Sequence, residues 1–244
     1  MSAATKLSSR LGAPDFTKRS LVAELVGPAG AGKTTLLRAL CQRNRQIVPG
    51  IRFNKTKYIP LFLSRIIYWL PHFLCRYAGS RWFTWRELRA MTYLAGGQQA
   101  LKSRADADEA VTVLDHGPIF RLALLHEFGP PLTKDRHYDQ WWGEMLAQWA
   151  STLSLVIWLD AGNEVLLQRI YARGRAHKIK GKSEPEAYAF LVRYRRVYQD
   201  IIEKLASLQG PALLCFDTEN QSSDQIVDAV LAAFEAERKK RMLL

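Results

Sequence analysis

A glycine-rich stretch with a lysine and a threonine, GPAGAGKT at residues 27–34, has the residue types that hold a phosphate group. Its glycines let backbone N–H groups wrap a β-phosphate at the positive end of a helix. The Lys33 ammonium is expected to reach the β- and γ-phosphate oxygens, and the Thr34 hydroxyl to ligate Mg²⁺. The residues predicted to bind the nucleotide are Gly27, Pro28, Ala29, Gly30, Ala31, Gly32, Lys33, Thr34 and Thr35.

An aspartate follows a second apolar run, AVTVL at residues 110–114. Ligands of open α/β sheets bind at the C-terminal ends of the strands, which is where Asp115 would lie. A carboxylate there can hold Mg²⁺ through water or accept the proton of an acceptor hydroxyl, so Asp115 is a candidate for both roles. The simpler alternative is that Asp115 caps the helix that Pro118 begins. His116 would lie beside the same site, either packing there or contacting a substrate.

Three arginines lead into a basic loop further along the chain. Arg169 and Arg173 are four residues apart, so they share one face of the helix predicted at 163–174, and Arg175 opens the loop RAHKIKGKSEPE. Phosphoryl transfer spreads negative charge over the γ-phosphate oxygens, and arginines that close over them stabilise that charge. We therefore expect a mobile lid at about 173–185 that also excludes water, rather than a solvated surface loop.

Strands and helices alternate along the chain. Buried apolar runs predict strands at residues 20–27, 46–53, 110–115, 153–160 and 212–218. Helical patterns lie between them, including an aromatic-rich helical region on the acceptor side at about 55–104. The alternation predicts an α/β fold, a P-loop NTPase three-layer α/β/α arrangement with a parallel sheet of about five strands. We expect one domain over 19–244, after a disordered polar lead-in at 1–18.

The chain is basic, with 35 Lys and Arg against 23 Asp and Glu, a formal net charge of +12. Such a field attracts polyanions, which include nucleotides, nucleic acid and anionic membrane surfaces. Three scattered cysteines argue against a disulfide framework or a zinc knuckle and favour a reducing, cytoplasmic compartment.

One segment, YIPLFLSRIIYWLPHFLC at residues 58–75, is apolar enough to raise the question of a membrane. Arg65 and Pro71 interrupt it, and the apolar run is shorter than the roughly 20 residues that a spanning helix needs. A buried helix or helical hairpin is the favoured interpretation. The alternative is an interfacial helix, because basic residues flank and interrupt the segment.

From about residue 110 to its end, the chain resembles the thymidylate kinases, within the nucleoside and nucleotide kinase group of P-loop proteins. The motifs VLDHGP, LDAGNEVLLQRIYARG, FLVRYRRVYQDII and FDTENQSSDQIVDAV follow one another in the order and spacing of that family. Together with the phosphate loop they cover over half of the chain.

The resemblance implies transfer of the ATP γ-phosphate with Mg²⁺. It implies that Lys33 and Thr34 act on the donor and that Thr34 and Asp115 hold the metal. The phosphate loop has no arginine of its own, which is similar to family members whose lid provides the catalytic arginine. The catalytic residues that the resemblance implies are Lys33, Asp115, Arg169, Arg173 and Arg175.

The acceptor side departs from the family pattern. His116 stands where members usually have Arg, and only Pro49 and Gly50 remain of the segment that grips the acceptor phosphate. The candidate acceptor-binding residues are Arg52, Tyr93, Gln99 and His116. A nucleoside monophosphate is the first expectation for the acceptor. Another small hydroxyl or phosphate compound, such as a nucleoside, a sugar or a lipid-linked molecule, is the alternative.

Other P-loop classes fit less well. LAGGQ at 94–98 resembles the signature of transporter-type ATPases, but His116 stands where that class needs a Glu. The GTPase motif N-K-x-D is missing, and no basic stripe with regularly spaced aromatic residues indicates nucleic-acid binding. The expected partners are therefore ATP and a small-molecule acceptor, with no specific nucleic acid; peripheral membrane contact is not favoured, and a homodimer is open.

Overall fold

The computed structural model describes residues 20–51, 55–102, 110–174 and 176–243. The lead-in predicted at 1–18 therefore lies outside the described residues, as do two of the candidate site residues, Arg52 and Arg175.

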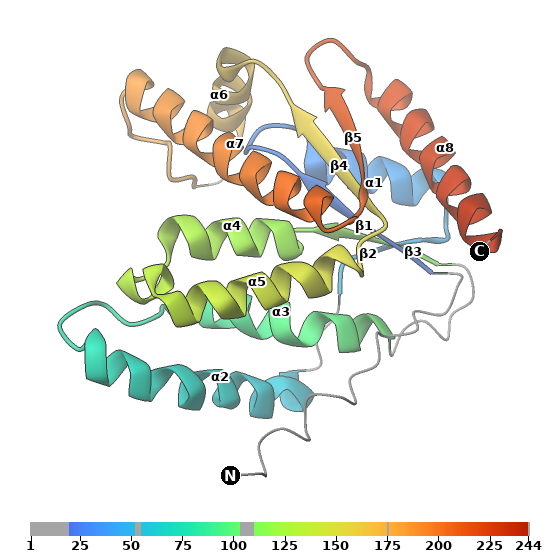
Figure 1. Cartoon of the computed structure of the whole chain (residues 1–244). Coiled ribbons are helices and arrows are strands. Elements are labelled where there is room, and N and C mark those ends of the chain that lie inside the picture. Colours follow the sequence, from blue (N-terminus) through green and yellow to red (C-terminus); the bar gives the residue numbers. More distant parts are fainter. Residues whose placement is uncertain (1–19, 52–54, 103–109, 175, 244) are drawn as a thin grey trace.

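The centre of the fold is a five-stranded sheet in which every neighbouring pair of strands is parallel (Figure 1). The strand order is β2-β3-β1-β4-β5, so the strand that precedes the phosphate loop is the middle one. This confirms the predicted α/β class and the strand number. The strands are β1 (Leu21–Val26), β2 (Ile47–Pro49), β3 (Val111–Asp115), β4 (Leu155–Asp160) and β5 (Ala212–Asp217).

Helices cover both faces of the sheet. Alternate residues of β1 enter two different cores: Leu21 and Leu25 pack with α1, α6 and α8, whereas Val22 and Val26 pack with α3, α4, α5 and α7. In Figure 1, α2 forms a further layer beyond α3. The helices are α1 (Lys33–Arg43), α2 (Lys55–Arg76), α3 (Trp85–Lys102), α4 (Pro118–Phe128), η1 (Pro131–Lys134), α5 (Arg136–Ala150), α6 (Asn163–Ala172), α7 (Glu184–Ser207) and α8 (Ser223–Met242).

Residues 58–75, for which a buried helix or a helical hairpin was predicted, lie within the single continuous helix α2, which packs against α3. However, α2 is buried on one side only: Trp69 is 1% exposed, whereas Ile67 is 70% exposed. Among the described helices, none is both long enough and apolar enough to cross a membrane.

A tryptophan fixes how α3 packs against α5. The Trp149 indole N–H donates a hydrogen bond to the Leu94 carbonyl at 3.0 Å, and its ring stacks on Tyr93 at a centroid distance of 6.0 Å. Gly97 leaves room for this ring, because a Cβ atom at that position would lie 2.7 Å from Trp149 Cζ2. The absence of a side chain at residue 97 therefore sets the distance between the two helices.

Alanine substitutions of two helical glycines, Gly97 and Gly143, should have opposite effects on the free energy of unfolding. Gly97→Ala forces a methyl group into the Trp149 ring and should lower the free energy of unfolding by about 1 kcal/mol or more. Gly143→Ala, in α5, adds a methyl group with no atom within 4 Å and should raise it by about 0.5–1 kcal/mol. Urea unfolding of both variants checks this. A stabilised Gly97→Ala variant would show that the helices can separate freely.

Candidate active site

The backbone of the phosphate loop is in close contact with the end of β4 and with α6. A Cβ atom at Gly27 would lie 2.0 Å from the Leu159 carbonyl oxygen at the end of β4, and φ there is 139°. A Cβ atom at Gly30 would lie 2.8 Å from the Leu166 carbonyl oxygen in α6, at φ 92°. Only glycine fits both the space and the backbone conformation at these two positions, so the loop has one fixed path.

Lys33, the first residue of α1, turns its side chain back into the loop. Its ammonium group donates hydrogen bonds to the Gly27 carbonyl at 2.7 Å and the Pro28 carbonyl at 2.8 Å. Burial lowers the pKa of Lys33 to about 8, although the nearby Asp115 carboxylate acts in the opposite direction. A phosphate in the loop would supply the negative charge that this buried amine lacks.

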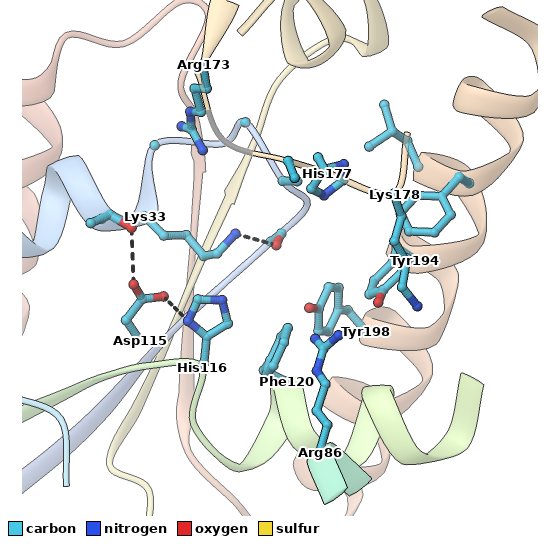
Figure 2. Close-up of a pocket in the computed structure, with 18 residues that line it drawn as sticks. Lys33, Arg86, Asp115, His116, Phe120, Arg173, His177, Lys178, Tyr194 and Tyr198 are labelled. Carbon is cyan, nitrogen blue, oxygen red and sulfur yellow. Dashed lines mark hydrogen bonds and ion pairs between the residues drawn. The ribbon is translucent and has the colours of Figure 1, made fainter. Parts of the chain in front are cut away.

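Thr34 and Asp115 come together as the sequence predicted. The Thr34 hydroxyl donates to Asp115 Oδ2 at 3.1 Å (Figure 2). Asp115 Oδ1 is shielded from solvent and receives no hydrogen bond from the described residues, although His116 Nδ1 lies 3.3 Å away. Hydroxyl and carboxylate oxygens are hard ligands, so this pair fits a Mg²⁺ ion held directly or through water.

His116 has an unusual backbone. Its φ is 61°, a left-handed conformation that is rare for residues other than glycine and is often found at functional sites. The ring packs edge-on against Phe120 at a centroid distance of 4.4 Å, and desolvation by the surrounding residues lowers the pKa of the imidazole, although half of the side chain is exposed. The ring presents a hydrogen-bonding group to the site.

These residues line one cavity of about 370 Å³ (Figure 2). Four cationic side chains reach it from the loop, α3 and the segment after α6: Lys33, Arg86, Arg173 and Lys178. Four aromatic side chains close it from α4 and α7: Phe120, Phe190, Tyr194 and Tyr198. The cavity thus combines positive charge with flat apolar walls, which suits a ligand that has both an anionic group and a ring.

A second cavity, of about 250 Å³, lies beside the same loop, against β5 and α8. Its lining includes Gly30, Gly32 and Thr35 of the loop and α1, together with Thr218 and Gln221. Arg173 lines both cavities, so it stands between them.

Arg169 and Arg173 have separate surroundings. Arg169 donates to the Thr218 hydroxyl at 2.9 Å and to the Thr218 carbonyl at 2.8 Å, and it lines the second cavity but not the first. Arg173 has an extended backbone just beyond α6. The two arginines therefore do not lie on one helix face, as their spacing had predicted, because the helix ends at Ala172.

Two of the predicted acceptor residues lie away from the cavity. Tyr93 is buried below the Arg121 guanidinium, which lies 4.0 Å from its ring centre, and Gln99 is exposed on α3. Neither lines either cavity. Arg86 and Phe120 line the first cavity instead. The sequence analysis did not identify Arg86, because no feature of the segment TWRELR distinguishes Arg86 from Arg89.

A partly buried ion pair holds the end of β4. The Arg195 side chain of α7 lies 2.7 Å from one Asp160 oxygen and 3.0 Å from the other, and it also donates to the Ala161 carbonyl at 2.7 Å. This contact ties α7, with its aromatic residues, to the tip of a central strand. Arg195 lies in the motif FLVRYRRVYQDII but received no role from the sequence.

The sequence analysis also assigned no role to Glu24, although Glu24 is the one charged residue within the apolar segment LVAELV. Its carboxyl group is fully buried and accepts the backbone N–H groups of Ile119 at 2.9 Å and Phe120 at 3.0 Å. Glu24 therefore fills the N-terminal hydrogen-bonding positions of α4. Burial raises the pKa of this carboxyl to about 8, against the lowering effect of the two N–H groups.

The raised pKa predicts a pH-dependent stability. A carboxyl group that holds its proton more tightly when folded contributes most below its unfolded pKa, and this contribution is lost as pH rises toward 8. Glu24→Gln mimics the protonated form at every pH. The unfolding free energy of the wild type, relative to Glu24→Gln, should fall between about pH 4.5 and 8 by up to about 4–5 kcal/mol. Urea unfolding across this range checks it, and parallel curves would contradict it.

Comparison with known proteins first defines the fold. No model of a known protein family matches the chain, and no curated protein matches it. Solved structures do match, and they share the fold class that the sequence predicted, an α/β arrangement of helices around a five-stranded parallel sheet.

One of the matching structures is that of a deoxyadenosine kinase from M. mycoides with bound dATP. The two chains are 14% identical with a TM-score of 0.52, over 88% of this chain and 100% of that one. The YorR protein from Bacillus subtilis, in complex with phosphorylated GDP, is 15% identical with a TM-score of 0.48, over 89% and 98%. The first likeness shows a shared fold. The specific resemblance to thymidylate kinases stays a prediction.

Proposed function

We propose that the protein is a kinase that transfers the γ-phosphate of ATP to a small acceptor. The observation that carries this proposal is the pair of cavities that share the phosphate loop and Arg173. A phosphate that passes from a donor in one cavity to an acceptor in the other must cross the loop region that both contain. An ATPase that uses water as its acceptor needs no second cavity with aromatic walls.

The donor nucleoside is assigned to the cavity beside α8, with its phosphates in the loop. Thr218 and Gln221 offer polar groups there, and Arg169 is held at its wall by Thr218. Lys33 provides the charge for the β- and γ-phosphates. Thr34 and Asp115 would hold Mg²⁺, which when bound neutralises charge on the phosphates.

The acceptor is assigned to the cavity below α7. An oxygen of its phosphate group would attack the γ-phosphate of ATP near Asp115, and ADP would leave. Because this oxygen is already ionised, Asp115 would not need to take a proton and would act by helping to hold Mg²⁺. Arg173 lies between the two ligands and would stabilise the charge on the phosphate in transit. The segment at 173–185, which includes Gly181 at φ 87°, would act as the lid that keeps water out.

The acceptor's chemistry follows from the walls of its cavity. Rings of Phe190, Tyr194 and Tyr198 follow one another at centroid distances of 4.8 and 5.8 Å, which offers faces for a base. Arg86 and Lys178 offer positive charge beside them. A nucleoside monophosphate supplies both a ring and an anion and is the proposed acceptor, whereas an unphosphorylated nucleoside would leave these charges without a partner.

An acceptor screen with ATP and Mg²⁺ tests the function. ADP formation should rise well above the no-acceptor background with at least one nucleoside monophosphate. Lys33→Ala should abolish that turnover, because the ammonium that contacts the transferred phosphate is lost. Lys239→Ala, an exposed residue of α8, is the matched control and should keep wild-type turnover. Turnover that persists in Lys33→Ala would rule out the assigned donor site.

Arg86 allows the class of acceptor to be tested. Arg86→Ala should raise KM for a phosphorylated acceptor by about tenfold or more, because a charge-assisted contact is lost, and should change kcat much less. Arg196→Ala, an exposed arginine of α7, is the matched control. Steady-state kinetics against the acceptor found in the screen measures this. An unchanged KM would place the acceptor's anionic group elsewhere.

A further inference from the structure

Helix α2 presents an apolar face to solvent. Ile67 is 70% exposed and Leu74 is 58% exposed, which are high values for large aliphatic side chains. Every side chain that the structure leaves exposed between residues 59 and 75 is apolar, aromatic or a cysteine. These residues are Ile59, Pro60, Leu63, Ile67, Tyr68, Leu70, Pro71, Leu74 and Cys75. A continuous face of this kind marks an interaction surface.

The other side of α2 is fixed, so the apolar face cannot turn inward. Trp69 packs against Tyr138 and Trp141 of α5 at centroid distances of 5.6 and 6.1 Å. His72 Nε2 lies 3.1 Å from the buried Asp135 carboxylate at the start of α5. These contacts set the rotation of the helix about its axis. The exposed face is therefore a constant feature of the folded protein.

The charged residues of α2 itself are all basic. No Asp or Glu occurs between residues 55 and 86, whereas Lys55 and Lys57 lie in the first turn of α2 and Arg76 ends it, 3.5 Å from the Asp135 carboxylate at the start of α5. Two copies of α2 packed face to face would bring basic ends together in either direction, which costs energy. An apolar surface with negative charges around it is the complementary partner, and a bilayer of anionic phospholipids has this chemistry.

We propose that α2 is an interfacial helix that docks the protein on an anionic phospholipid bilayer. The helix lies in the plane of the membrane surface, with its apolar face among the upper acyl chains and its basic ends at the lipid phosphates. Trp85, which is 64% exposed and whose ring lies 4.6 Å from that of Phe62, continues the same surface. In Figure 1, α2 is the outermost of the described helices, and no other labelled helix or strand lies beyond it on that side.

Trp85 is followed in the chain by Arg86, which lines the first cavity. The docking itself does not depend on the proposed kinase activity, because none of the residues of the apolar face lines either cavity.

Vesicle sedimentation with the full chain tests the proposal. The wild type should sediment with phosphatidylcholine vesicles that contain phosphatidylglycerol, and much less with phosphatidylcholine alone. Ile67→Glu and Leu63→Glu each place a charge on the apolar face and should lower binding by about tenfold or more. Leu213→Glu, on strand β5, is the matched control: this residue is 46% exposed, and its variant should bind as the wild type does.

Three results would overturn the proposal. The first is a wild-type protein that sediments with neither vesicle. The second is that the Ile67→Glu and Leu63→Glu variants bind as well as the wild type. The third is a dimer, seen by light scattering, that Ile67→Glu dissociates while no vesicle binding is found; the face would then belong to a second copy. Thermal unfolding of each variant shows that lost binding is not lost folding.

Discussion

The buried carboxyl group of Glu24 fixes the turn on which the candidate site is built. It comes from the central strand β1 and accepts the first free N–H groups of α4, so it joins β1 to the segment that follows β3. Gly117 is needed to let this happen, because a Cβ atom there would lie 2.7 Å from the Glu24 carboxyl carbon. The same turn holds His116 at a positive φ and leaves Asp115 facing Thr34. A polar contact inside the core therefore determines where the site's carboxylate lies.

The basic residues around the site fall into two groups with different physical roles. Arg169 and Arg195 are each satisfied by protein oxygens, and they join α6 and α7 to the ends of β4 and β5. Lys33, Arg86 and Arg173 instead reach the wall of the cavity. The first group builds the frame, and the second provides the field that a negatively charged ligand would meet. The net charge of the chain alone did not reveal this division.

Local patterns predicted the fold and the phosphate loop well, because strand periodicity, glycine spacing and the strand-tip aspartate all act over short stretches. Predictions that depend on where a side chain points after packing were weaker. Tyr93 and Gln99 lie on the predicted helix, but Trp149 and Arg121 hold Tyr93 in the core and Gln99 faces solvent. Arg173 differs from Arg169 because α6 stops one residue before it. Helix ends and side-chain directions are set by tertiary contacts that no short window of sequence contains.

The hydrogen bonds that Lys33 makes to its own loop have a consequence for ligand binding. An anion in the loop would take over this ammonium group and raise a pKa that is about 8 without it. Binding near pH 8 would then draw about half a proton from the buffer for each molecule bound, and far less at pH 7. The calorimetric heat of nucleotide binding would therefore depend on the ionisation enthalpy of the buffer, and affinity would weaken in alkaline solution. Binding of an anion to the phosphate loop would thus be coupled to the uptake of a proton by Lys33.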